Sequence, residues 1–266
     1  MLAITSPQET KYTELAANHG KFEIPGCYPG YGTTLGNALR RVLLSSLEGA
    51  AAHSIKIQGV SHEFSTIPGV MEDVVQIILN LKQVRFRLHG EEAIKITLKS
   101  KGEGVVTAGD FKTTSEVEVV NPELVIATIS DKKTEFEMEV EVGKGLGYLP
   151  AEQRDREEVE IGVIAIDAIY TPVKRVNYEV ENMRVGKRTD FDKITLEILT
   201  DGSITPTEAF EKSVSILVNQ FQSLQVGTGV AKKEVIEEAT PEVTSEEVAP
   251  KKEKATRKKK VEETEA

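Results

Sequence analysis

The sequence predicts an α+β protein, and three observations lead to this prediction. Period-2 alternation of apolar and charged residues, typical of strands with one solvated face, dominates the middle of the chain. Helix-like spacing of apolar residues occurs on both sides of that region. The end of the chain is almost entirely polar. A strand-rich segment that interrupts a helix-bearing unit suggests one domain inserted into another, followed by a tail.

The first helix is expected over residues 35–47, and it carries two different faces. At about 100° per residue, Leu44 falls nearly opposite the main apolar stripe, beside Arg40 and Arg41. An apolar anchor next to arginines is the composition expected where a second protein docks. The alternative is a buried helix whose arginines only cap a sheet, and residue types alone do not decide between the two. The stripe itself consists of Leu35, Leu39, Val42, Leu43 and Ser46.

Glycines at positions 30, 32 and 36 are expected to form a tight turn that leads into this helix. Glycines before a helix can instead hold a phosphate, because a helix N-terminus attracts anions. A dinucleotide site needs a strand directly before the glycines, however, and Pro25 and Pro29 interrupt that segment. A stand-alone phosphate- or nucleotide-binding enzyme using Gly30–Gly36 is therefore kept as an alternative function.

A second helix is expected over residues 70–81, after Pro68-Gly69, with Lys82 at its C-terminal end. There a cation interacts favourably with the helix dipole. Strands are expected where apolar residues alternate with charged ones, and also over residues 161–170, which are nearly all apolar. The alternating strands are residues 84–88, 94–98, 136–142 and 194–198.

The third helix, residues 207–225, has the strongest start signal in the chain. Thr205 and Glu208 are spaced as a capping box, and Pro206 occupies the first helical position. Its apolar residues are spaced 4, 3, 4, 3, which is a heptad pattern and favours helix-to-helix dimerisation. The alternative is a helix that packs only on its own sheet. The heptad residues are Phe210, Val214, Leu217, Phe221 and Leu224.

Composition and charge exclude several functions. The net charge of −10 argues against a body that grips nucleic acid, because that requires Lys and Arg to neutralise phosphates. Cys27 is the only cysteine, so no intrachain disulfide can form. The four histidines lack metal-ligand spacing, and Glu72 and Asp73 diverge on a helix too far to share a proton. We therefore expect no catalytic residue, metal or cofactor in this chain.

No apolar run reaches the roughly 20 residues of a membrane-spanning helix, and no N-terminal signal is present, so a cytoplasmic protein is expected. After residue 228, clusters of Lys and Glu run to the end without aromatic residues. Such a segment buries too little apolar surface to offset chain entropy. Residues 229–266 are therefore predicted to be a disordered charged tail.

Ordered sequence blocks give this chain a resemblance to a known family. The segment GYGTTLGNALRRVLLSS, residues 30–46, is similar to the signature of the α subunit of bacterial RNA polymerase. The resemblance spans about residues 20–226. Its further blocks are HEFST (62–66), GVMEDV (69–74), LNLK (79–82), GYLP (147–150), TPV (171–173) and RTDFDK (188–193).

This resemblance implies a non-catalytic subunit that homodimerises and then recruits the β and β′ subunits, within a complex that also contains ω and σ. It implies a dimerisation domain formed by residues 1–48 and 171–228, with helices on an antiparallel sheet, and a mostly-β inserted domain of residues 49–170. Family members usually carry a further helical domain for DNA contacts, and residues 229–266 are too few and too polar for one. The resemblance therefore gives no support for DNA contact by this chain.

The resemblance also assigns roles to particular residues. Arg41 and Leu44 match positions that contact β, and Lys82 matches a position that faces β. Arg188 and Asp190 match a stretch near β and β′, although neighbouring opposite charges can instead form a local surface pair. Dimerisation is assigned to Leu35, Leu39 and the heptad residues of the third helix. A generic dimerisation adaptor unrelated to transcription is the second alternative function.

Overall fold

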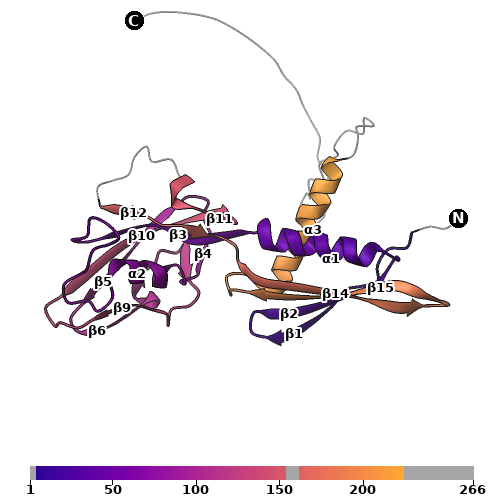
Figure 1. Ribbon diagram of the computed structural model, residues 1–266, viewed down its shortest axis with the longest axis horizontal. Coiled ribbons are helices and arrows are strands. Elements are labelled where there is room, and N and C mark those ends of the chain that lie inside the picture. Colours follow the sequence, from indigo (N-terminus) through magenta and orange to yellow (C-terminus); the bar gives the residue numbers. More distant parts are fainter. Residues whose placement is uncertain (1–3, 154–161, 225–266) are drawn as a thin grey trace, which may run out of the picture. The chain divides into compact units, whose positions relative to one another are not determined.

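The computed structural model describes residues 4–153 and 162–224, and it confirms the α+β class (Figure 1). The described helices are α1 (Tyr31–Ser45), α2 (Val74–Leu81) and α3 (Pro206–Ser223). Two short 3-10 helices, Ala108–Asp110 and Ala151–Gln153, join neighbouring strands. The predicted tail, residues 229–266, lies outside the described residues.

One antiparallel sheet has the strand order β1-β2-β15-β14, and it carries α1 and α3. Its strands are β1 (Lys11–Ala16), β2 (His19–Cys27), β14 (Val173–Val185) and β15 (Arg188–Thr200). Apolar residues alternate along β15, so Ile194, Leu196 and Ile198 all enter one core with Leu43 of α1 and Ala209 of α3. This core joins residues from near both ends of the described chain.

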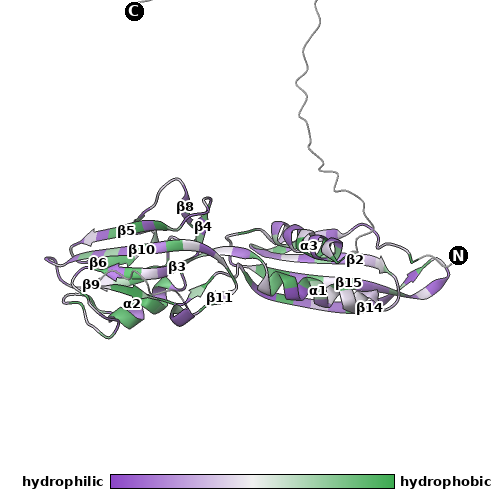
Figure 2. Cartoon of the chain, turned by 90° about the horizontal axis from the view of Figure 1, so that it is seen from above, coloured by the Kyte–Doolittle hydropathy of each residue, from purple (hydrophilic) through white to green (hydrophobic). Residues whose placement is uncertain are grey.

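A second, larger sheet has the order β7-β5-β10-β3-β4-β8, with β12 also paired to β3. Its strands are β3 (Glu48–Ile57), β4 (Phe86–Leu88), β5 (Ile94–Lys101), β7 (Phe111–Lys112), β8 (Val117–Val119), β10 (Glu135–Leu146) and β12 (Val163–Ala165). Two small ribbons complete the strands, β6 (Gly104–Thr107) with β9 (Val125–Ile129) and β11 (Tyr148–Leu149) with β13 (Ala168–Ile169). The helix α2, hydrophobic along most of its length (Figure 2), packs into the core of this sheet.

The helix α1 begins at Tyr31, so the expectation that Gly32 and Gly36 belong to a preceding turn is wrong. Only Gly30 has a turn conformation, with φ of 85°, and it is the N-cap. Both later glycines are buried in the helix, where a Cβ on Gly32 would lie 2.7 Å from Val180 and one on Gly36 would lie 2.6 Å from Tyr178. These glycines therefore allow the helix to approach the sheet closely.

The helix α2 begins at Val74, four residues later than expected. The Asp73 side chain accepts a hydrogen bond from the Gln76 backbone N–H at 2.7 Å, which makes Asp73 the N-cap. Glu72 instead accepts from the backbone N–H of Thr128 on β9, at 2.7 Å. The helix does not extend towards Val70, because the Asp73 carboxylate caps it and the Glu72 carboxylate binds the neighbouring strand β9.

The predicted start of α3 is confirmed, whereas the strand predicted over residues 161–170 is not. The capping box of α3 is confirmed, with Thr205 and Glu208 bonding to each other's backbone N–H groups and Pro206 at the first position. The single strand expected over residues 161–170 is wrong within the described residues. There the chain forms β12 and β13, separated at Ile166-Asp167, and the Asp167 side chain bonds to other segments instead of continuing a strand.

Candidate partner-binding surfaces

The N-terminus of α1 is held by a carboxylate from a distant strand. Asp192 on β15 accepts hydrogen bonds from the backbone N–H groups of Gly30 and Gly32, both at 2.9 Å. The side chain of Asp192 is buried and its charge complements the helix dipole. The position that a phosphate would take on these N–H groups is thus filled by the chain itself, which removes the basis for a phosphate site at Gly30–Gly36.

Near the other end of α1, Arg41 is exposed and Leu44 is half-buried. Among the described residues, the Arg41 guanidinium has no hydrogen bond or ion pair. Leu44 does not lie free of the core as its helical position suggested, because it packs on the same core as Leu43. Arg41 therefore offers a cation for a partner, and Leu44 beside it is an apolar side chain that packs on the core of its own domain.

Lys82, the C-cap residue of α2, reaches across to another segment. Its Nζ lies 3.0 Å from Oδ2 of Asp167, and the other oxygen of Asp167 accepts from the Ala151 backbone N–H at 3.0 Å. The Ala151 N–H and then Lys82 hold the pKa of Asp167 below its ordinary value. Lys82 is therefore positioned by a specific ion pair and not only by the dipole of its own helix.

Arg188 and Asp190 form a local pair on β15. The guanidinium donates two hydrogen bonds to the carboxylate, at 3.0 and 2.6 Å, and this contact holds the pKa of Asp190 below its ordinary value. Arg188 also lies over the rings of Tyr28 and Phe191, at 5.7 and 5.1 Å from their centroids. The pair is exposed, and the two rings fix the direction of its cation.

The heptad residues of α3 divide into two groups. Phe210 and Leu217 pack on the chain's own core, and Phe210 stacks on Phe22 with ring centroids 4.5 Å apart. Exposure is large for the other three residues and for one residue that the heptad pattern omitted: Val214 37%, Val218 45%, Phe221 63% and Leu224 72%. The helix thus buries one stripe in its own domain and leaves a second apolar stripe without cover from the described residues.

The two α1 residues assigned to dimerisation are also in contact with the chain's own core. Leu39 is buried and Leu35 is half-buried, and both contribute to the core beneath α1. A dimer contact through Leu39 is therefore not available in this conformation. The helices α1 and α3 contact each other and strands of the same antiparallel sheet, so the structure brings Leu35 and the α3 residues to one sheet.

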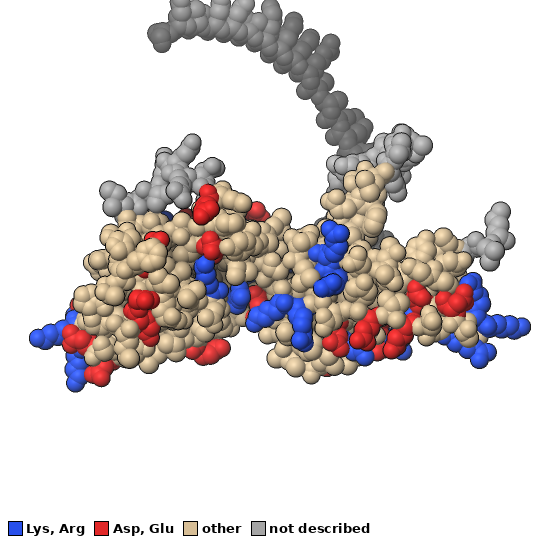
Figure 3. Space-filling model, in the orientation of Figure 1, with Lys and Arg blue, Asp and Glu red and all other residues tan. Residues whose placement is uncertain are grey.

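Other polar faces are internally paired. Along β10 and β5, Glu135 pairs with Lys101, Glu137 pairs with Lys99 at 2.5 Å, and Lys95 pairs with Glu139 at 3.7 Å. The glutamates of β10 therefore form a cross-strand ladder of opposite charges with lysines of β5. On the face that Figure 3 shows, acidic and basic side chains likewise lie near one another.

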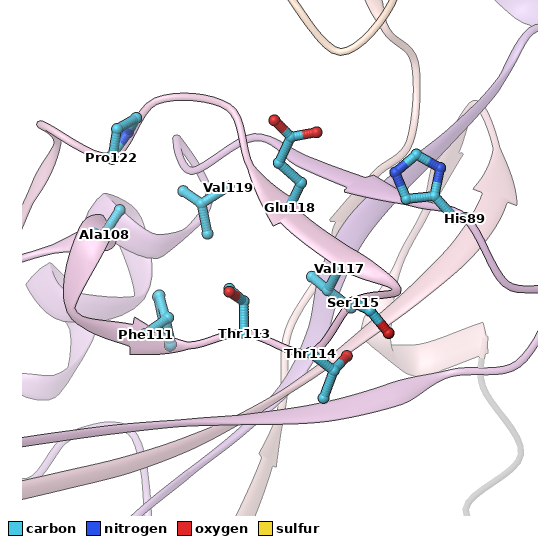
Figure 4. A pocket seen from close by; sticks show the side chains of 11 residues that line it. His89, Ala108, Phe111, Thr113, Thr114, Ser115, Val117, Glu118, Val119 and Pro122 are labelled. Atoms are coloured by element: carbon cyan, nitrogen blue, oxygen red, sulfur yellow. The ribbon is translucent and has the colours of Figure 1, made fainter.

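The cavity beside β8 does not bring its polar groups together at one point. One cavity of about 470 Å³ beside β8 is lined by His89, Thr113, Thr114, Ser115 and Glu118, whose polar atoms lie spread around its rim (Figure 4). Within residues 4–153 and 162–224, no three His, Cys, Asp or Glu side chains are grouped so that they could hold a metal ion. None of the described helices is both long and apolar enough to cross a membrane.

Three residues with clear structural roles were missed in the sequence. Asp192 lies within the RTDFDK block, but its contact with α1 joins positions that are 160 residues apart or more. Asp167 interrupts an apolar run, which is a signal that could have marked it as a polar group with a specific partner. Val218 lies one turn after Val214, a helical neighbour that a strict heptad count passes over.

Comparison with known proteins agrees with this architecture. Residues 55–171 match the family model described as the RNA polymerase Rpb3/RpoA insert domain. The chain is 52% identical to the DNA-directed RNA polymerase subunit alpha of Carboxydothermus hydrogenoformans over 84% of this chain and 70% of that relative. The corresponding subunit of a Roseiflexus species is also 52% identical, over 84% and 68%. That of Alkaliphilus oremlandii is 48% identical over 86% and 75%. With relatives this similar, the chain belongs to the family of α subunits of DNA-directed RNA polymerase, a nucleotidyltransferase complex.

Proposed function

We propose that this chain is a homodimeric scaffold that nucleates RNA polymerase assembly by recruiting the β and β′ subunits. The observation that supports this most is the contrast between paired and unpaired surfaces. The charged faces of β5 and β10 form ion pairs with each other, whereas the apolar stripe of α3 is exposed and the Arg41 guanidinium has no hydrogen bond or ion pair within residues 4–153 and 162–224. As part of that proposal, the chain works in the bacterial cytoplasm, where the polymerase meets its DNA.

The proposed dimer contact is the exposed stripe of α3, facing α1 and α3 of a second copy. Large exposed apolar side chains that follow one another along a helix are typical of a protein interface. Val214, Val218, Phe221 and Leu224 form such a series over three turns. Leu35, Phe210 and Leu217 support the stripe from the core side, and Leu39 holds the fold of the domain.

The proposed contact with the large subunits lies at Arg41 and Leu44, with Lys82 and the Arg188–Asp190 pair as further contact points. Arg41, whose guanidinium has no hydrogen bond or ion pair among the described residues, fits an interface hot spot, because arginine is enriched there. Leu44 beside it adds apolar contact area. A carboxylate of β opposite Arg41 would complete a charge-assisted hydrogen bond.

The proposed division into domains follows the two main cores of the described residues. One core draws on residues 22–47 and 173–209, and the other draws on residues 52–166. This distribution supports a dimerisation domain of residues 1–48 and 171–228 with an inserted domain of residues 49–170. The family match to residues 55–171 supports the same division.

The test is capture of purified β by the immobilised full chain. Arg41→Ala and Leu44→Ala are each expected to weaken capture by at least about tenfold, the effect of a typical hot-spot residue. Arg184→Ala is the matched control, since Arg184 is an exposed arginine on β14 that bonds only to the carbonyl of Gly186. Melting curves show whether Leu44→Ala, which also touches the core, remains folded.

Failure of the wild-type chain to capture β would contradict the scaffold role itself. Normal capture by both alanine variants would mean that β docks elsewhere. A generic dimerisation adaptor predicts dimers that bind neither β nor β′.

A further inference from the structure

The ribbon formed by β11 and β13 has one buried face and one bare face. Tyr148 pairs with Ile169, and Leu149 pairs with Ala168. Directly opposed residues in antiparallel strands point to the same side. Leu149 and Ala168 enter a small core with Ala51 and Tyr170, so Tyr148 and Ile169 project from the other side.

This outer side is apolar and uncovered by the described residues. Tyr148 is 58% exposed, Ile169 is 41% exposed, and Leu146, which ends β10 just before the ribbon, is 56% exposed. We call Leu146, Tyr148 and Ile169 the ribbon patch. Gly147, with φ of 64°, turns the chain between Leu146 and Tyr148. The solvated face of β5 and β10 carries a Glu–Lys ladder, whereas the described residues place no such cover over the ribbon patch.

The ribbon lies between two of the proposed contact points for the large subunits. On one side, a Cβ built on Gly147 would lie 4.0 Å from the carbonyl oxygen of Ser45, in the last turn of α1, one turn after Arg41. On the other side, Asp167 directly precedes β13 and binds Lys82 at 3.0 Å. The Tyr148 side chain is hydrogen-bonded to Asp167, so it lies beside the ion pair, and desolvation together with this hydrogen bond raises the pKa of Tyr148.

We propose that the ribbon patch is the centre of the docking surface for β, joining Arg41 and Leu44 on one side to Lys82 on the other. The Tyr148 ring is the anchor, since tyrosine supplies a large apolar area with few rotatable bonds. Asp167 is a positioning residue that orients both Tyr148 and Lys82. This inference rests on the proposed scaffold function.

The occupant that fits is a segment of β with an apolar centre and carboxylates near its edge. The apolar part would cover Tyr148 and Ile169, and a carboxylate would meet Arg41, whose guanidinium has no partner among the described residues. A second copy of the chain fits less well. The exposed stripe of α3 already offers a surface for it, whereas the ribbon lies near the last turn of α1, one turn after Arg41, and next to the Lys82–Asp167 pair.

The experiment titrates purified β onto the immobilised full-length dimer. Tyr148→Ala and Ile169→Ala are each expected to raise the Kd for β by about tenfold or more without changing the dimer. Val105→Ala is the matched control, because Val105 is 57% exposed on β6, which pairs with β9 and not with the ribbon. It is expected to bind like wild type.

The outcomes separate this inference from the scaffold proposal. Wild-type binding by both ribbon variants, with Arg41→Ala still defective, would overturn the ribbon patch and leave the scaffold intact. Equal weakening by Val105→Ala would also overturn it. If Tyr148→Ala lowers the melting temperature, Leu146→Ala on β10 provides the same test, and its wild-type affinity would count against the patch. A wild-type chain that does not bind β removes both proposals.

Discussion

At the scale of single residues, the described structure depends on carboxylates that act far from their place in the sequence. Asp192 satisfies two N–H groups at the start of α1, where Gly30 has no side chain to serve as a cap. Asp167 likewise connects α2, the 3-10 helix at Ala151 and the ribbon. Both residues lie next to surfaces that we assign to partners, so they orient those surfaces without needing to touch a partner.

Replacing Asp192 by alanine is expected to lower the free energy of unfolding by about 2–3 kcal/mol, because hydrogen bonds to charged groups contribute about 1.5–3 kcal/mol and the freed N–H groups are poorly solvated. Urea denaturation of the purified protein measures this change. Asp190→Ala, two residues earlier on β15, removes only an exposed pair and should leave the urea midpoint nearly unchanged. Equal effects of the two variants would show that Asp192 does not hold the helix.

At the scale of elements, a helix in this chain serves two surfaces at once. The buried stripe of α3 contains Pro206, Ala209 and Ser213, whereas Val214, Val218 and Phe221 lie on its exposed side. Small buried residues allow α3 to pack closely on its own domain, and large exposed ones leave apolar area for a partner. Because α3 has one buried face and one exposed apolar face, a single heptad pattern described its contacts incompletely.

Phe221→Glu is expected to raise the dimer dissociation constant by at least about tenfold, since a charge would have to be buried against apolar side chains without a partner. Sedimentation equilibrium measures the dissociation constant. Gln220→Glu adds the same charge to the neighbouring exposed position and should leave the dimer unchanged. A Phe221→Glu protein that dimerises like wild type would exclude the exposed stripe as the dimer contact.

The capping box of α3 predicts a dependence on pH. The Thr205 backbone N–H, which donates to Glu208 at 3.0 Å, holds the pKa of Glu208 below its ordinary value. A carboxylate with a lowered folded-state pKa stabilises the fold above its unfolded pKa, and this contribution is lost as the pH falls through the folded pKa. The stability difference between wild type and Glu208→Gln should therefore shrink over that acidic range. Urea titrations at several pH values measure the difference, and one that stays constant would contradict the assignment.

At the scale of the whole molecule, this subunit of DNA-directed RNA polymerase has two main cores within its described residues. One contains Leu43 with Ile194, and the other contains Met138 with Phe86. Residues of the second core all lie between the two halves of the first along the chain. Under the proposed scaffold function, this arrangement would let one proposed domain hold the dimer contact while the other presents additional partner contacts.

The proposed domain division predicts two separable unfolding transitions, one for each core. Leu43→Ala is expected to lower the midpoint of one transition and Met138→Ala that of the other, each by a loss of about 2–5 kcal/mol from its own unit. Both side chains are fully buried, so the two variants control for each other. Differential scanning calorimetry records the transitions. A single transition that both variants shift equally would contradict the proposed domain division.

Local pattern in the sequence determined the types of most elements and the α+β class. Residues within a few positions of one another form the alternation along residues 94–98 and 136–142 and the capping box at Thr205. Such patterns can be recognised directly in the sequence. The quoted sequence blocks determined the family in the same way. Sequence reasoning was weaker at helix starts, since the start of α1 is stabilised by Asp192 and that of α2 is delimited by contacts to β9.

Only the tertiary structure decided which surfaces remain open. Periodicity grouped Phe210 with Phe221. The structure separates them, because Phe22 of β2 stacks on Phe210 and Phe221 is exposed. The ion pair of Lys82 with Asp167 and the bare face of Tyr148 also depend on segments that are distant along the chain. A residue's availability to a partner depends on what its own fold has already placed against it, and that information lies in long-range contacts and not in local pattern.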